Sequence, residues 1–241
     1  MPAASSPRSH HGLRGIDLAD TVVVTLGARA ATPADDHRAL AQLVARLAGV
    51  GVASVSLQQR CPHCGAADHG ALRVHLVGQP DATATATVRV SLARAGGRLA
   101  LAVTAAGPVG IDVESVAALG RAPVDDVLLS PAEAQALAGR DPRAATADLA
   151  VLWTAKEAVL KAAGVGLRVD PRELTVTLDP AGVAAVAGSP GQPTLADWPA
   201  APFPVRNVHL VSVPAPVGSV ATVAVVCAER PRLLVMPVGA R

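Results

Sequence analysis

Short β-branched segments alternate with two helical segments along this chain, and glycine and proline separate them. β-Branched or alternating apolar residues predict strands at 22–26, 52–57, 72–77, 87–92, 98–104, 109–113, 174–178, 205–213 and 220–227. Helical periodicity marks 38–47 and 143–163, which end at glycines. On either side of Gly107 the chain therefore contains a main helix and several strands. This pattern predicts the α+β fold class, built as two similar α/β halves.

The same pattern suggests where the halves begin and end. We expect a flexible tail at 1–19, an N-terminal half at 20–106, a C-terminal half at 107–230 and a second tail at 231–241. Two turn signals refine this division. Gly96-Gly97 predicts a hairpin turn, and Ser130-Pro131-Ala132-Glu133 has the residues of a capped helix start. The segment 181–201, rich in glycine, proline and alanine, is predicted to be a loop.

Composition excludes several classes of protein. The chain is 51% hydrophobic but has no tyrosine, one phenylalanine and two tryptophans, so its core must consist of alanine, valine and leucine. A net charge of +2 is too small for a strongly basic nucleic-acid binder. No apolar run reaches the roughly 18 residues of a membrane span, and the start has no apolar stretch typical of a secretion signal. Three cysteines offer no disulfide framework, so we expect a cytoplasmic protein.

Lysine is nearly absent, and its placement is informative. Only two of the 21 cationic side chains are lysines, and both lie in one short segment, at Lys156 and Lys161. Lysine carries a compact charge that approaches a phosphate closely and has a pKa that its surroundings shift readily. Because arginine serves at every other cationic position, we expect the chemistry of this protein in the segment that keeps the lysines.

Two carboxylates precede that segment. Asp112 and Glu114 stand two positions apart at the end of a predicted strand, so their side chains project from one face, whereas Ile111 and Val113 point into a core. Carboxylate oxygens at this spacing suit Mg²⁺. The alternative is an ordinary polar strand end.

The lysine segment itself has a helical stripe of functional side chains. Trp153, Glu157 and Lys161 follow one another at intervals of four, and Lys156 is rotated by about 100° from Glu157. A solvated Glu–Lys pair, worth about 0.2–0.5 kcal/mol, is the alternative interpretation. Combined with the strand carboxylates, the stripe supplies three carboxylates and two ammonium groups, which suits metal-assisted phosphoryl-type transfer.

The two segments together resemble a known family. The sequence contains Gly110-Ile111-Asp112-Val113-Glu114 and, later, Trp153-Thr154-Ala155-Lys156-Glu157-Ala158-Val159-Leu160-Lys161. In order and spacing these are similar to the two signature motifs of the 4′-phosphopantetheinyl transferases, G-[IV]-D-[VI]-E and [WF]-x-x-K-E-x-x-x-K. The chain length and the two-half layout resemble the monomeric, Sfp-type branch.

The resemblance implies a fold, a reaction and a set of roles. The two α+β halves would form a pseudo-dimer with coenzyme A and the active site in the cleft between them. Asp112, Glu114 and Glu157 would hold Mg²⁺ against the pyrophosphate, and Lys156 and Lys161 would bind phosphate oxygens. A serine of an acyl or peptidyl carrier protein would attack the β-phosphate, and 3′,5′-ADP would leave. Glu157 and Lys161 are the catalytic candidates, with Glu157 as the base, directly or through water.

Two segments differ from the family pattern. Relatives have [HYF]-G-K-P or [HYF]-G-R-P where this chain has His69-Gly70-Ala71-Leu72, and S-[LI]-[ST]-H where it has Ser91-Leu92-Ala93-Arg94. Expected coenzyme A contacts therefore include His69, Gly70 and Ser91. Arg94 is expected to replace the histidine as a phosphate ligand, and Arg60 or Arg73 to replace the missing basic residue.

Other interpretations remain open at this stage. Cys61, Cys64, His63 and His69 suggest zinc, but a structural site needs four ligands and no second cysteine pair follows. Arginines at 140, 143, 168 and 172 would either meet an acidic carrier protein or only confer solubility. Besides the transferase, a relative that binds coenzyme A with weakened turnover and a different metal-dependent phosphoryl enzyme, such as a hydrolase, use the same residues.

Overall fold

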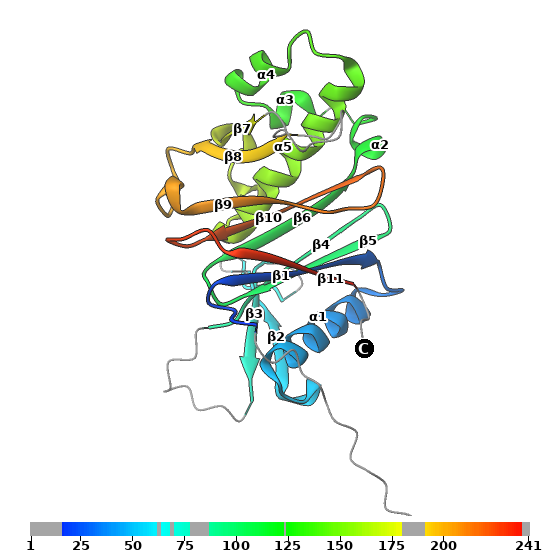
Figure 1. Ribbon diagram of the computed structural model, residues 1–241, viewed down its shortest axis with the longest axis vertical. Helices are drawn as coiled ribbons and strands as arrows, with labels where there is room; N and C mark the ends of the chain where they lie inside the picture. The colour runs from blue at the N-terminus through cyan, green and yellow to red at the C-terminus, as the bar shows by residue number, and fades with distance from the viewer. Residues whose placement is uncertain are drawn as a thin grey trace, which may run out of the picture.

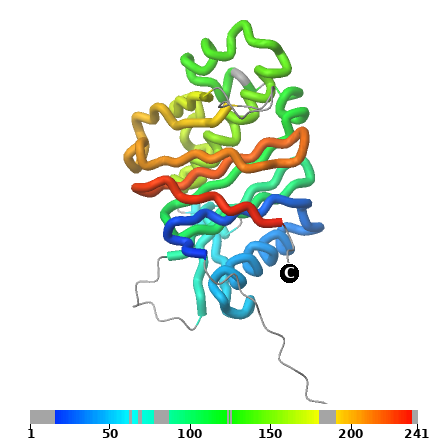
Figure 2. Tube along the Cα trace, in the orientation of Figure 1, coloured from blue at the N-terminus to red at the C-terminus, as the bar shows by residue number. Residues whose placement is uncertain are grey.

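The computed structural model describes residues 16–61, 64–67, 70–77, 87–122, 124–179 and 191–237. His69, one of the predicted coenzyme A contacts, lies outside these residues, as do residues 1–15 of the predicted N-terminal tail. Within the described part, the chain forms layers of sheet and helix (Figure 1; Figure 2 traces the same path along the backbone).

The largest layer is a six-stranded sheet with the strand order β11-β1-β5-β4-β3-β2. Its strands are β1 (Thr21–Ala28), β2 (Val55–Gln59), β3 (Leu72–Leu76), β4 (Arg89–Ala95), β5 (Arg98–Thr104) and β11 (Arg232–Pro237). Neighbours pair antiparallel except β1 and β11, which run parallel. The predicted hairpin between β4 and β5 is confirmed, because Gly96 and Gly97 both have the positive φ that such a tight turn requires.

Helix α1 (Pro33–Ala48) covers one face of this sheet (Figure 1). Its first turn is capped by the Thr32 side chain, which accepts from the amide of Asp35, and Gly49 ends it in the left-handed conformation. Leu40 and Val44 project from its buried face and pack against Val23 and Leu101 of the sheet. The predicted helix at 38–47 is therefore confirmed and extends further toward the N-terminus.

A three-stranded sheet packs on the other face of the large sheet. It has the order β6-β10-β9, from β6 (Val109–Ser115), β9 (Val208–Val213) and β10 (Ser219–Val226). Ile111 and Val113 of β6 are fully buried against Val22 and Val24 of β1. These two strand residues thus point into a core, as expected from their alternation with Asp112 and Glu114.

Helix α5 (Pro142–Ala163) lies on the outer face of the small sheet. Asp141 caps its start and Gly164, in the left-handed conformation, ends it. Short elements surround the helix at the end of the molecule opposite α1 (Figure 1): α2 (Val116–Leu119), α3 (Asp125–Leu128), α4 (Pro131–Leu137), β7 (Thr175–Asp179), β8 (Gln192–Asp197) and the 3₁₀ turns η2 (Gly166–Arg168) and η3 (Pro171–Glu173). Two further 3₁₀ turns are η1 (Val52–Ser54) and η4 (Val205–Asn207).

Five predictions about local structure are wrong. Residues 232–237 are not a tail but β11, because their alternating apolar side chains complete the large sheet beside β1. Ile16 and Leu18, assigned to the N-terminal tail, pack against the α1 core. Residues 192–197, predicted as loop, form β8 on β7. Residues 52–54 and 205–207 start their predicted strands with a 3₁₀ turn instead.

The α+β fold class is confirmed: the described residues form three sheets together with helices that pack on them. The similarity of the two halves and the cleft between them stay predictions. None of the helices in the described part of the chain has the length and hydropathy of a membrane-spanning segment.

Candidate functional site

The site begins with an unusually close approach of α5 to β6. A Cβ on Gly110 would lie 1.9 Å from the carbonyl oxygen of Ala158 and 2.7 Å from the amide nitrogen of Ala162. Only glycine leaves room for helix backbone at that distance. The strand residues next to Gly110 are thereby held against the stripe of α5 that faces them.

That contact joins the two predicted motifs. The Nζ of Lys161 donates to Oδ1 of Asp112 at 2.6 Å and to the carbonyl oxygen of Ile111 at 3.2 Å. Two turns earlier in α5, the Trp153 side chain lies close enough to Glu114 to lower the pKa of that carboxyl. The predicted stripe on α5 therefore faces the carboxylates of β6 and is only partly exposed to solvent. The alternative of a solvated surface pair is wrong for Lys161.

Burial raises the pKa of each of the three carboxyl groups, and repulsion by neighbouring carboxylates raises it further for Glu114 and Glu157. Burial raises the pKa of Asp112, against the opposing effect of the Lys161 ammonium. Burial also raises the pKa of Glu114, and the charge of Asp112 adds to it. Burial raises the pKa of Glu157, with Lys161 lowering it and both strand carboxylates raising it. Asp112 is only 6% exposed, so it does not lie at an ordinary solvated strand end.

Two oxygens in this group have no hydrogen-bond partner. Oδ2 of Asp112 and Oε1 of Glu157 are both buried and unpaired. Buried carboxylate oxygens without a donor are unfavourable unless a cation or a donor joins them. As the side chains lie, no three or more His, Cys, Asp or Glu side chains of the described residues are arranged to hold a metal ion. The group thus has spare oxygen ligands but not a ready-made metal geometry.

A pair of threonines borders the group and was not predicted. The Thr154 hydroxyl of α5 and the Thr222 hydroxyl of β10 lie 2.9 Å apart in the buried interior. Thr222 is the register partner of Asp112 and so shares its face of the small sheet. The sequence holds little signal for this contact, because it joins residues 68 positions apart.

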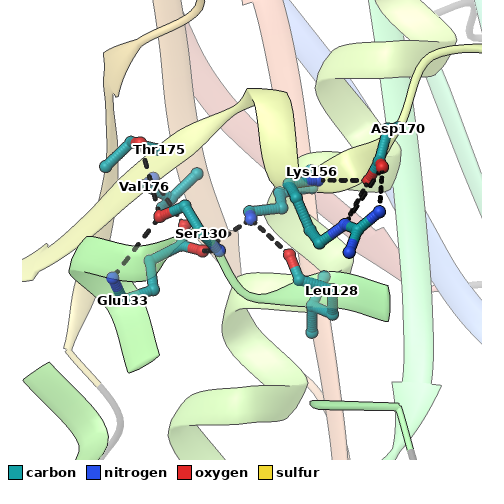
Figure 3. Close-up of polar contacts among 8 residues, drawn as sticks. Leu128, Ser130, Glu133, Lys156, Asp170, Thr175 and Val176 are labelled. Carbon is teal, nitrogen blue, oxygen red and sulfur yellow. Dashed lines mark hydrogen bonds and ion pairs between the residues drawn. The ribbon is translucent and has the colours of Figure 1, made fainter. Parts of the chain in front are cut away.

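Lys156 does not lie among the carboxylates in this structure, and its role as a phosphate ligand stays a prediction. Its side chain is 1% exposed, and its Nζ donates to Oε2 of Glu133 and to the carbonyl oxygen of Leu128, both at 2.6 Å (Figure 3). Burial lowers the pKa of the ammonium group, and the hydrogen bond and charge of Glu133 oppose this effect. The turn of about 100° between neighbouring helix residues directs Lys156 away from the stripe of Glu157.

Arg94 and Ser91, two predicted coenzyme A contacts, both have hydrogen-bond partners within the chain. Arg94 leaves β4 on the α1 side, and its Nε donates to Oδ2 of the buried Asp36 at 2.6 Å. Ser91 points the other way, and its hydroxyl accepts from the amide of Ile111 at 3.1 Å. Arg94 therefore serves as the partner of a buried carboxylate, while Ser91 ties β4 to the free edge of β6. One guanidinium nitrogen of Arg94, Nη2, has no partner, so the roles of both residues toward coenzyme A stay predictions.

The remaining predicted coenzyme A contacts lie near the β2–β3 edge of the large sheet. Arg60 and Arg73 are exposed, and Gly70 makes a tight turn with φ of 101°, where a Cβ would lie 2.9 Å from the carbonyl oxygen of Arg60. The carbonyl of Gly70 accepts from the Gln59 side chain at 2.8 Å. Figure 1 shows β2 and β3 at the α1 end of the molecule, so they are not gathered with the carboxylates.

Three of the four flanking arginines have partners within the chain. Arg140 pairs with Asp148 and Arg172 with Asp170, whereas Arg168 donates to the carbonyl oxygens of Gly164 and Val165 that end α5. Hydrogen bonds from Arg172 hold the pKa of Asp170 at about 2. Their role toward a carrier protein stays a prediction.

The comparison with known proteins bears on the segment that contains the site. Residues 108–210 match the family model described as the 4′-phosphopantetheinyl transferase superfamily. A comparison with curated proteins found no match. The matched segment contains both motifs, the strand β6 with its carboxylates and the helix α5 with its lysines. The similarity of this chain to the 4′-phosphopantetheinyl transferase superfamily therefore covers residues 108–210.

Proposed function

We propose that this protein transfers the 4′-phosphopantetheine arm of coenzyme A to a serine of an acyl or peptidyl carrier protein, with Mg²⁺ as cofactor and 3′,5′-ADP as the second product. One observation carries the proposal. Within the segment that matches the superfamily, Lys161 and Glu157 of α5 face Asp112 and Glu114 of β6 across the close contact at Gly110. Both expected motifs thus contribute to one group.

The side chains of this group suit a divalent metal. Asp112, Glu114 and Glu157 would hold Mg²⁺, because they offer hard oxygen ligands, two of which are buried without a partner. Each of the three carboxyls has a raised pKa, so a cation placed among them relieves burial and repulsion together. When bound, the metal supplies charge neutralisation to phosphate oxygens.

The residues of the chain have separate roles in the transfer. Lys161 contacts Asp112 in the absence of substrate. In the transfer reaction, its ammonium group binds a phosphate oxygen. Glu157 takes the proton of the carrier serine, whose oxygen forms a bond to the β-phosphorus while the bond from that phosphorus to the bridging oxygen of 3′,5′-ADP breaks. Positioning and charge account for most of the acceleration.

A second candidate is a relative that binds coenzyme A and turns it over poorly. The observation that favours it is Arg94, which was expected to hold the 3′-phosphate and instead pairs with the buried Asp36. A chain without that anchor binds coenzyme A weakly. Its Michaelis constant for coenzyme A is then high, and its rate at ordinary coenzyme A concentrations is low.

Mass spectrometry of an apo carrier protein tests the proposal. Incubated with this protein, coenzyme A and Mg²⁺, a panel of acyl and peptidyl carrier proteins gains the mass of the phosphopantetheine arm and 3′,5′-ADP appears in equal amount. No mass gain across the panel contradicts the proposal. Saturable coenzyme A binding without mass gain identifies the second candidate. Release of 3′,5′-ADP without an acceptor indicates a hydrolase instead.

Thermal unfolding tests the metal assignment without relying on activity. A ligand that binds only the folded state raises the melting temperature. Mg²⁺ therefore raises the melting temperature of the wild type and raises that of Glu157→Gln less. Glu229→Gln, at an exposed position outside the group, responds like the wild type. An equal response of all three proteins would exclude Glu157 as a ligand.

A further inference from the structure

A second polar group lies directly behind the proposed site, and every member of it is buried. The Glu133 carboxylate accepts three hydrogen bonds (Figure 3). Its Oε2 accepts from the amide of Ser130 at 2.7 Å and from Nζ of Lys156 at 2.6 Å, and its Oε1 accepts from the amide of Val176 at 2.7 Å. We call Glu133 and Lys156 the junction pair.

The junction pair joins five parts of the chain. Glu133 belongs to α4, Ser130 to the linker before it, Lys156 to α5 and Val176 to β7. Lys156 adds the carbonyl oxygen of Leu128, the last residue of α3. The elements packed around α5 on this side are therefore all tied to one ammonium and one carboxylate.

Such a pair allows little displacement of the helix that carries it. Lys156 is 1% exposed and Glu133 is 3% exposed, so water cannot replace a lost partner. A buried ion whose partner is removed is left uncompensated, which is strongly unfavourable, whereas the intact pair is stabilised by every added hydrogen bond. Hydrogen bonds also lose strength steeply with distance and angle. The contacts of Lys156 with Glu133 and Leu128 thereby fix the rotation of α5 about its own axis.

The front of α5 carries the residues of the proposed site. Glu157 follows Lys156 directly, and Lys161 lies five positions later in the same helix. We propose that Glu133 and Lys156 are positioning residues for the transfer reaction, which hold α5 in the rotation that turns Glu157 and Lys161 toward Asp112. The inference rests on the proposed function, because positioning matters only if these side chains act on a substrate.

The pair also accounts for a lysine where this chain otherwise uses arginine. Both lysines donate to one carboxylate and one backbone carbonyl: Lys156 to Glu133 and Leu128, and Lys161 to Asp112 and Ile111. A compact ammonium meets two such acceptors from one atom, whereas a planar guanidinium needs a wider space and spreads its donors over a fork. An arginine at 156 is therefore not an equivalent cation.

Four variants test the inference in the full-length protein. Glu133→Gln and Lys156→Arg each disturb the pair, and the double variant Glu133→Leu, Lys156→Met replaces it with apolar groups. Replacement of a buried pair by apolar residues of similar volume is often neutral for stability, so the double variant separates folding from positioning. Asp148→Asn is the control, because Asp148 is another buried carboxylate on α5 and pairs with Arg140 outside the junction pair.

Kinetics give the first measurement. In the folded fraction of each pair variant, kcat falls about 10-fold to 100-fold, the loss expected when a reacting group is misplaced by about 1 Å. The Michaelis constant for coenzyme A changes less, because neither side chain reaches the solvent. The control keeps kcat within about 3-fold of the wild type, since substitutions outside a coupled group mostly act independently. A double variant with wild-type kcat would overturn the inference.

A spectroscopic measurement is independent of activity. The chain has two tryptophans, so 5-fluorotryptophan gives one ¹⁹F resonance from Trp153 beside Glu114 and another from the buried Trp198. The pair variants shift the Trp153 resonance, and the control leaves it in place. The Trp198 resonance reports whether the core around it remains folded.

The two measurements separate the inference from the proposed function. If the wild type transfers nothing, the proposed function fails, and a Trp153 shift in the pair variants still supports a fixed rotation of α5. If the wild type is active and the Trp153 resonance stays unchanged in all pair variants, the positioning role is wrong although the function stands. A pair that only stabilises the fold would lower the melting temperature and leave kcat and the Trp153 resonance of the folded protein unchanged.

Discussion

The folded chain destabilises the ionised form of Glu157. This side chain is partly buried, its Oε1 has no partner, and the charges of Asp112 and Glu114 raise its pKa further. Because the pKa is raised, the ionised carboxyl is less favourable in the folded chain than in the unfolded chain. Residues held under such conditions occur where function requires them, at the expense of stability.

Glu157→Gln should therefore abolish transfer and stabilise the fold. The substitution removes one of three neighbouring negative charges and keeps a polar group of the same size. We expect a gain of about 1 kcal/mol, seen at pH 8 as a melting temperature roughly 2–4 °C higher. Differential scanning calorimetry and the carrier-protein assay measure both effects. The exposed Glu229→Gln serves as the control, and a lower melting temperature for Glu157→Gln would contradict the account.

Lys161 makes the opposite contribution, because it neutralises a buried carboxylate. Lys161→Met leaves Asp112 buried without its charged partner, which lies 2.6 Å away in the wild type. Stability should fall by roughly 1–3 kcal/mol, as for the loss of a charged hydrogen bond. Adding Asp112→Asn removes the stranded charge and should restore part of that loss, while transfer stays abolished. Urea unfolding of the two single variants and the double variant forms a cycle, and strict additivity would show that the two side chains do not interact.

Among the elements, the contact of α5 with β6 decides whether the site exists. Gly110 is the only position along that contact, among the described glycines, where a Cβ would meet helix backbone of α5. Backbone cannot move aside as a flexible side chain does, so the helix would have to shift as a whole. The same helix is held on its other side by the junction pair.

Gly110→Ala should separate the helix from the strand and lower both stability and turnover. The added methyl group lies 1.9 Å from the carbonyl oxygen of Ala158 unless α5 moves. Overpacking of this kind costs about 1–3 kcal/mol or more. Gly51→Ala is the matched control, because Gly51 has nothing within 4 Å and an ordinary φ of −68°. Thermal unfolding and the Trp153 ¹⁹F resonance measure the effect, and equal behaviour of the two variants would refute the close contact.

On the scale of the whole molecule, a buried carboxylate fastens α1 to the large sheet. Asp36 is fully buried, and it accepts from Arg94 and from the amide of Ala30. Burial raises the pKa of Asp36, but the hydrogen bonds from Arg94 and Ala30 and the charges of Arg94 and Arg29 outweigh it, so the pKa lies below its ordinary value of 3.8. The ionised carboxylate is therefore favoured by folding.

This sign predicts the pH dependence of stability. A group with a lowered pKa stabilises the fold fully above 3.8 and loses that contribution as the pH falls through its lower value in the folded chain. Asp36→Asn should be less stable than the wild type at pH 6, and the difference should shrink below about pH 4. Urea unfolding at a series of pH values measures this difference. A constant difference from pH 6 to pH 2.5 would contradict the assigned pKa.

Local patterns in the sequence determined most elements of this protein. Alternating apolar residues marked the strands, the glycines at 49 and 164 marked where α1 and α5 end, and the alternation in β6 placed Ile111 and Val113 in the core. Such features depend on neighbours one to four positions away, which the chain itself specifies. The spacing of two motifs likewise predicted that Asp112 and Glu157 would belong to one group.

Tertiary structure decided what each cation meets. Lys156 and Lys161 look alike in the sequence, yet one binds Glu133 behind α5 and the other binds Asp112 in front of it. Arg94 has an acidic partner 58 positions earlier, at Asp36. Strand β11 pairs with β1, although the two strands lie near opposite ends of the chain. The physical reason is that an ion pair or a sheet edge depends on distance in space, and the packing of distant layers sets that distance. Local pattern therefore fixed the helix that carries the site, and only the folded layers fixed which of its side chains face the proposed substrate.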